Sequence, residues 1–174
     1  MDTILEIIQY TLPSLIVLAA TLYTIRSFLS TDDKRKQYEL RMQNQRSTIP
    51  IRLQAYERLA LFCERIAPNN LIHRVRKPHM TAQELNFALI QDIRHEYDHN
   101  LSQQIYVSPD TWNLVTVAKE EMITVINRLS GMIPPDVPEK ELSKKIFEFF
   151  MSEGVVLPTQ KALSKLKSEV KYIY

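Results

Sequence analysis

Hydrophobic side chains are arranged in two ways along this chain: one uncharged segment near the start, and helical stripes over the remainder. No charged side chain occurs from Ile7 to Ile25. At about 1.5 Å rise per residue, a helix of that length covers about 28 Å, close to the thickness of a bilayer's hydrocarbon layer. A cleaved signal peptide would have basic residues before the apolar run, whereas Asp2 and Glu6 stand there. The pattern therefore predicts a single transmembrane anchor within residues 1–29.

Positive charge flanks this segment on one side only. No Lys or Arg precedes it, whereas several follow it closely: Arg26, Lys34, Arg35, Lys36, Arg41 and Arg46. Basic residues gather on the cytoplasmic side of membrane spans, so we expect the N-terminus outside and the remaining domain in the cytoplasm. Residues 30–49 are polar nearly all round and predict a juxtamembrane helix or tether.

One stripe of the predicted span carries small and polar side chains. At 100° per residue, Gln9, Pro13, Ala20 and Thr24 fall on the same side of the helix. Membrane helices pack through such residues, because lipid provides no hydrophobic drive for helix association. A partner face is one interpretation, and the other is that Ser and Thr are tolerated anywhere in a span.

The rest of the chain repeats the helical period. An apolar stripe follows Thr48 and Pro50, and its members are Ile51, Ala55, Leu59, Phe62, Cys63 and Ile66. Thr81 with Glu84 predicts a capping box for a helix over about 82–105, and Ser108 before Pro109 predicts the start of a helix over about 109–131. Two long helices joined by so short a connection form an antiparallel αα-hairpin.

A stiff proline-rich break, residues 133–138, separates this helical domain, 50–131, from a predicted C-terminal helical pair, 132–174. No segment shows sustained strand alternation, so the fold class predicted is all-α, a helical bundle after one transmembrane helix. The only glycines are Gly131 and Gly154, where helical patterns stop, which excludes glycine-rich phosphate loops. A net charge of +2 gives no reason to expect nucleic-acid binding.

One motif carries chemistry. His95-Glu96-Tyr97-Asp98-His99 matches H-E-x-x-H, in which two histidines one helical turn apart bind Zn²⁺ and the glutamate activates its water. The antiparallel neighbour offers Glu120 or Glu121 as a third ligand. However, Asp98 places a charge inside the motif, no H-x-x-G-x-x-H extension follows, and no sheet edge is predicted to present a substrate. Ordinary surface histidines at the rim of the apolar stripe are the favoured interpretation.

A second local feature is the basic segment His73 to His79, with Arg74, Arg76 and Lys77. Cations at the end of a helix complement the negative end of its dipole, which is the simpler explanation. Contact with an anionic lipid surface is the functional alternative, and nucleic acid ranks below it because no aromatic residues are interleaved.

The segments 50–59 and 100–107 are distinctive. They resemble an uncharacterised family of small bacterial proteins with one N-terminal span and a helical cytoplasmic region. The likeness implies a bacterial inner-membrane location but no activity, ligand or catalytic residue.

Together these features favour a non-catalytic accessory or scaffold subunit over an enzyme. Its expected partners are the lipid bilayer and another integral membrane protein or its own copies, and no cofactor is expected. The rival hypothesis is a membrane-tethered zinc metallopeptidase that uses His95 and His99 as ligands and Glu96 as base.

Overall fold

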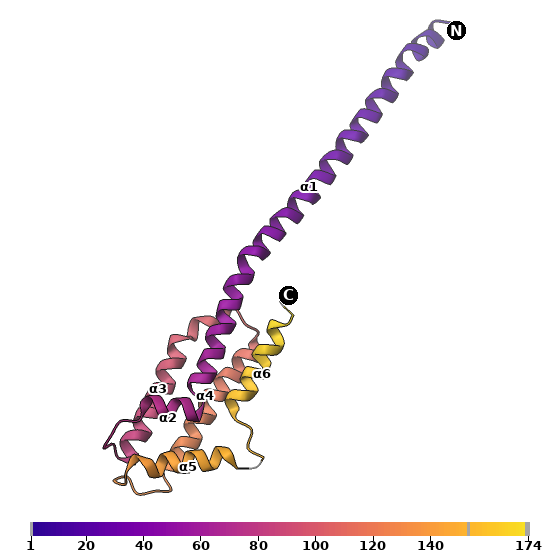
Figure 1. Ribbon diagram of the computed structural model, residues 1–174. Coiled ribbons are helices and arrows are strands. Elements are labelled where there is room, and N and C mark those ends of the chain that lie inside the picture. The colour runs from indigo at the N-terminus through magenta and orange to yellow at the C-terminus, as the bar shows by residue number, and fades with distance from the viewer. Residues whose placement is uncertain (1, 153, 173–174) are drawn as a thin grey trace. The chain divides into compact units, whose positions relative to one another are not determined.

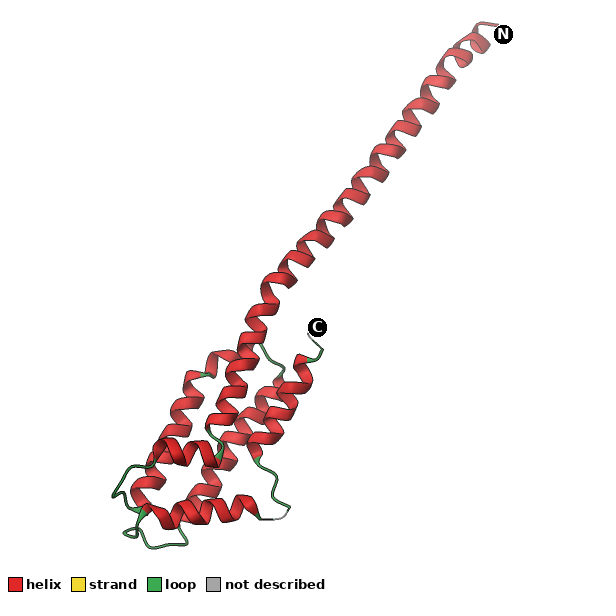
Figure 2. Cartoon of the chain, viewed as in Figure 1, coloured by secondary structure: helices red, strands yellow, loops and turns green. Residues whose placement is uncertain are grey.

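The computed structural model is built from α-helices (Figures 1 and 2). It describes the backbone of residues 2–152 and 154–172, and the side chains of 15–26, 35–40, 42–43, 47–152 and 154–172. The elements are α1 (Asp2–Arg65), α2 (Pro68–Val75), α3 (Ala82–His99), the 3₁₀ helix η1 (Leu101–Ile105), α4 (Pro109–Ser130), α5 (Glu139–Met151) and α6 (Pro158–Val170). The described backbone contains no β-strand, which confirms the all-α prediction.

The chain divides into two compact units, one ending at Thr48 and the other beginning at Ile49. The predicted helix start at Thr48 and Pro50 is wrong, because α1 continues through both residues. Proline in a helix interior removes one backbone hydrogen bond and tends to kink the helix rather than always ending it. The segments predicted as anchor, tether and first bundle helix are therefore parts of one helix.

The described side chains of the first unit are exposed, and several are large and apolar. Leu15, Ile16, Val17 and Leu18 are each more than half exposed. The hydroxyl of Thr24 donates to the carbonyl of Ala20 at 2.8 Å, so this polar group is satisfied within the helix. Among the residues whose side chains are described, no helix is apolar over a stretch long enough to cross a bilayer.

The second unit has one continuous hydrophobic core. α1 from Ile49 onward, α3, α4 and α6 run along the unit, and α2 and α5 lie across them (Figure 1). The stripe predicted after Pro50 is buried at Ala55, Leu59, Phe62, Cys63 and Ile66, and the helices that follow add chiefly Leu85, Leu89, Ile93, Met122, Ile126, Leu142, Ile146 and Leu166. Ile51 is the exception, because it is 47% exposed at the edge of the unit.

The predicted αα-hairpin is present, with one boundary changed. Thr81 and Glu84 form the capping box and Ser108 caps α4, as the sequence predicts. α3 ends at His99 rather than near residue 105, because the side-chain amide of Asn100 donates to the backbone carbonyl of Glu96 at 2.7 Å. That bond satisfies a carbonyl left free at the helix end, and η1 then carries the chain to α4.

The predicted C-terminal pair, 132–174, packs within the same unit as residues 49–131. α6 lies along α4, and α5 contacts α2, α3 and α4. The loop before α5 pairs with the loop before α3: the Ala82 amide donates to the Val137 carbonyl at 2.8 Å, and the Glu139 amide donates to the Met80 carbonyl at 3.1 Å. These bonds fix the two loops to each other.

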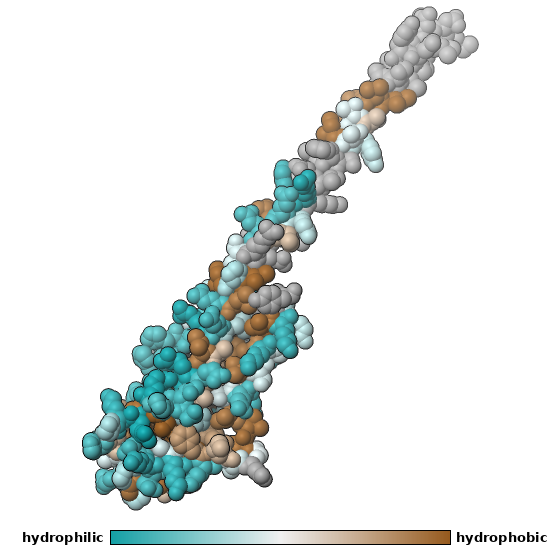
Figure 3. Space-filling view, in the orientation of Figure 1, coloured by the Kyte–Doolittle hydropathy of each residue, from teal (hydrophilic) through white to brown (hydrophobic). Residues whose placement is uncertain are grey.

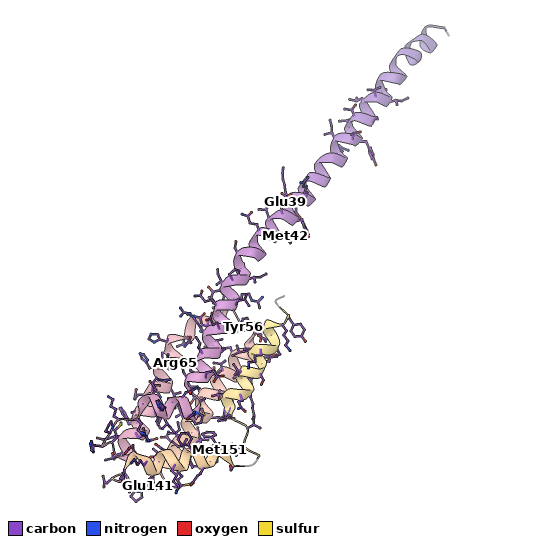
Figure 4. All side chains as sticks on the ribbon, in the orientation of Figure 1. Glu39, Met42, Tyr56, Arg65, Glu141 and Met151 are labelled. Atoms are coloured by element: carbon purple, nitrogen blue, oxygen red, sulfur yellow. The ribbon has the colours of Figure 1, made fainter. Side chains whose placement is uncertain are left out.

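A polar cluster around Glu169 connects α6 to the other long helices. The Tyr56 hydroxyl of α1 donates to one carboxylate oxygen at 2.9 Å, and the Ser108 hydroxyl that caps α4 donates to the other (Tyr56 is labelled in Figure 4). Partial burial acts to raise the pKa of Glu169, but the hydrogen bonds that its carboxylate accepts outweigh burial and lower it. The pKa of Tyr56 is raised, by burial and then by its bond to Glu169.

We expect Glu169→Gln to lower the free energy of unfolding at pH 7 by about 1–3 kcal/mol, since hydrogen bonds to a charged acceptor contribute about that much. The folded-state pKa of Glu169 lies below its ordinary 4.5. Its ionised form therefore contributes stability above pH 4.5, and that contribution is lost as the pH falls through the folded-state value.

Urea unfolding of both proteins between pH 7 and pH 3 measures this contribution. The difference between wild type and Glu169→Gln should shrink as the pH falls. Glu148→Gln is the matched control on an exposed carboxylate and should change stability by less than about 0.5 kcal/mol. An equal difference at every pH would contradict a role for the Glu169 charge.

Candidate functional site

A cavity of about 860 Å³ lies where the loop between α2 and α3 meets the start of α5. Its wall runs from the end of α2 through residues 76–81 on one side and residues 136–140 on the other. Hydrophilic residues dominate this end of the second unit, at the lower left of Figure 3. The paired loops hold the wall in place, so the cavity is built on fixed backbone.

The loop that forms this wall has an unusual backbone. His79 has φ 65, in the left-handed region that residues with a Cβ seldom adopt. On the same loop, residues 77–80 also line a neighbouring hollow of about 670 Å³, where Phe87 is 65% exposed. Residues in such conformations persist only where the surroundings hold them, and they are enriched at binding sites.

The cavity is charged with both signs. The positively charged residues that line it are Arg76, Lys77 and Lys140, and the imidazoles are those of His73 and His79. Asp136 and Glu139 bring carboxylates. Glu139 is only 7% exposed, and among the described residues its carboxylate takes part in no hydrogen bond or ion pair.

The three predicted basic residues divide between two roles. Arg76 and Lys77 are exposed and line the cavity. Arg74 instead pairs with the Asp92 carboxylate of α3 and donates to the backbone carbonyl of Arg65 at 3.2 Å. Its charge is therefore engaged within the unit, where it joins α2 to α3.

The H-E-x-x-H residues point to different surroundings. His95 and His99 are exposed, with ring centroids 4.6 Å apart. The Glu96 carboxylate is 2.6 Å from the guanidinium of Arg65 and 3.8 Å from that of Arg74 (Arg65 is labelled in Figure 4). Its partners are thus two arginines of α1 and α2.

The proposed third ligands do not complete a metal centre. Among the residues with described side chains, no three of His, Cys, Asp or Glu come together in a way that would hold a metal ion. Glu120 is exposed and pairs with Lys119 at 2.8 Å, and Glu121 is exposed beside it. The geometry thus assigns Glu96 to packing between helices.

An apolar groove of about 310 Å³ lies between α4 and the segment after α5. Phe149, Phe150, Val155 and Val156 supply its apolar surface, and the exposed carboxylates of Glu120 and Glu121 are also part of its lining. The neighbouring Met151 is 83% exposed (labelled in Figure 4). In Figure 3 apolar residues gather at the lower right, beside this segment.

The structure also places Cys63 and part of the predicted partner face of the N-terminal helix. Cys63 is buried in the core, where burial raises the pKa of its thiol to about 12, so no reactive thiolate forms there. Of the predicted partner face, Ala20 and Thr24 are exposed, and the side chains of Gln9 and Pro13 lie outside the described residues.

Sequence reasoning found Arg76 and Lys77 but missed Glu139 and the groove. Glu139 follows Pro138 at the start of a helix, where an acidic residue is ordinarily explained by the helix dipole. Its burial depends on the pairing of two loops far apart in the sequence. The only available signal for the groove was the pair Phe149-Phe150 next to a glycine-marked helix end.

Glu96→Gln should lower the free energy of unfolding by about 1–3 kcal/mol, because it leaves two arginines without their shared carboxylate. His99→Ala, which removes an exposed ring, should change it by less than about 0.5 kcal/mol. Thermal or urea unfolding compares the two variants in parallel, and elemental analysis of the same samples measures zinc. A stoichiometric zinc that is lost in His99→Ala, with greater destabilisation than in Glu96→Gln, would contradict the structural role.

Comparison with curated proteins and with solved structures found no match to this chain. A family profile described as "Family of unknown function (DUF7935)" matches residues 2–173, which confirms the expected resemblance to an uncharacterised family. The chain belongs to this family, DUF7935.

Proposed function

We propose that this chain is a non-catalytic accessory or scaffold subunit of the bacterial inner membrane. Its N-terminal segment anchors it with the C-terminal domain in the cytoplasm, and its second unit binds another integral membrane protein or a second copy of the chain. The apolar groove between α4 and the end of α5 is the observation that carries this proposal. Its phenylalanines are only partly buried against the core, and Val156 is 55% exposed.

The composition of the groove favours a particular partner surface. An apolar patch next to exposed carboxylates is complementary to a segment that carries apolar side chains followed by Lys or Arg. Segments on the cytoplasmic flank of membrane spans have that composition, because basic residues gather there. The cytoplasmic flank of another membrane protein is therefore the partner that the groove suits best.

The anchor rests on separate support. Ile7 to Ile25 has no charged side chain, and basic residues follow it without any before it. The described apolar side chains at 15–18 are exposed rather than packed in a core.

A polypeptide that lacks residues 1–29 should leave the membrane fraction, whereas the full chain should resist extraction with alkaline carbonate.

Val156→Asp should reduce recovery of the partner at least tenfold when the chain is extracted from native membranes in mild detergent and purified. The substitution removes the apolar contact of Val156, and the new carboxylate must be desolvated when the partner binds. Met132→Asp is the matched control, since Met132 is 58% exposed against 55% for Val156 and lies outside the groove.

Mass spectrometry of the purified samples identifies the partner or shows a defined oligomer. Equal recovery with Val156→Asp and Met132→Asp would remove the groove from the proposal. Wild-type protein recovered as a monomer without a stoichiometric partner would reject the accessory-subunit function itself.

A further inference from the structure

The carboxylate of Glu139 is placed as a ligand-binding group would be. Glu139 lines the cavity between residues 76–81 and 136–140, the residue as a whole is 7% exposed, and no described side chain pairs with its carboxylate. Arg76, Lys77 and Lys140 line the same cavity, yet none of them forms an ion pair with it. The cations stay in solvent while the carboxylate lies in the wall.

The carboxylate faces the cavity rather than the core, because its oxygens are not among the buried side-chain atoms that lack a hydrogen-bond partner. Glu139 is the first residue of α5, so the positive end of the helix dipole stabilises its charge. A positive group supplied from outside the chain would give this carboxylate the ion pair that no described residue of the protein provides.

The other charges that line the cavity restrict the kind of ligand that could carry this positive group. Counted without its imidazoles, the lining carries three cations, Arg76, Lys77 and Lys140, against the carboxylates of Asp136 and Glu139. A ligand that was only a cation would be repelled by this rim, and one that was only an anion would leave Glu139 unpaired. The charges therefore select a molecule that carries both signs.

We infer that this cavity binds a small zwitterion, whose ammonium group pairs with Glu139 and whose phosphate pairs with Arg76 and Lys77. Arg offers a planar set of donors to phosphate oxygens, and Lys adds a mobile positive charge. The volume of about 860 Å³ is within the range of small-molecule sites. Pro78 and Pro138 stiffen the two sides of the wall between which the ligand would lie.

Calorimetric titration of the full chain in detergent micelles tests the inference, with phosphoethanolamine as the probe. Ethanolamine and inorganic phosphate each present one half of it. We expect phosphoethanolamine to bind at least tenfold more tightly than either half. Glu139→Gln and Arg76→Gln should each weaken its binding at least tenfold.

Glu141→Gln is the matched control, because Glu141 is an exposed carboxylate in the same first turn of α5 (labelled in Figure 4). It should leave binding unchanged. Thermal unfolding of each variant checks folding, and if Glu139→Gln does not fold, the exposed Arg76→Gln decides the outcome. Phosphate binding as tightly as phosphoethanolamine, with no effect of Glu139→Gln, would reduce the cavity to an anion patch and overturn the inference.

The same chemistry occurs in a free molecule and in a lipid headgroup. Vesicles of phosphatidylcholine with and without phosphatidylethanolamine distinguish the two, because the choline group has no N–H to donate to Glu139. Binding of soluble phosphoethanolamine alone identifies a free ligand, and Glu139-dependent binding to the ethanolamine vesicles identifies the lipid. Absence of binding to both probes would overturn the inference.

Discussion

The structure depends most on the burial of one apolar stripe, contributed by the last turns of α1 and the residue that follows the helix. Leu59 and Phe62 of α1 and Ile66 just after it are fully buried, and they share one core with α3, α4, α5 and α6. Burial of each such side chain contributes about 1.5–3 kcal/mol, which is why this core decides the arrangement of the helices. Polar contacts then fix their register: Tyr56 reaches Glu169 on α6, and Arg65 reaches Glu96 on α3. The second unit is thus organised around the helix that continues from the N-terminal segment.

Both candidate binding surfaces lie at the ends of α5, the helix that crosses the unit. Its first residue, Glu139, lies in the wall of the charged cavity, and its last turn carries Phe149 and Phe150 into the apolar groove. The long segments, α1 from Ile49 onward, α3, α4 and α6, bury their apolar side chains in one shared core. Where helices end and loops meet, packing is incomplete, and side chains remain uncovered for ligands or partners. The H-E-x-x-H residues, in contrast, lie at the C-terminal end of α3, where the Glu96 carboxylate pairs with Arg65 and Arg74.

The features that local sequence determines were predictable, and those that depend on distant pairing were not. The capping box of Thr81 and Glu84, the Ser108 cap and the apolar stripes follow from neighbours within one or two turns. The continuation of α1 through Pro50 was missed, since proline normally marks a helix start. The burial of Glu139 was missed because the bond from its amide to the Met80 carbonyl joins residues that are far apart in the chain. Local patterns give helices and their faces, but they do not show which loops will meet.

The central claim is that the groove beside α5 is covered by a partner in the native membrane. A photo-crosslinking amino acid placed at Val156, and in parallel at Met132, tests this claim in intact cells, since both positions are similarly exposed and only Val156 lines the groove. The account predicts a discrete crosslinked product from position 156, containing either one membrane protein or a second copy of this chain, and none from position 132. Equal products from both positions, or no product from position 156, would contradict it.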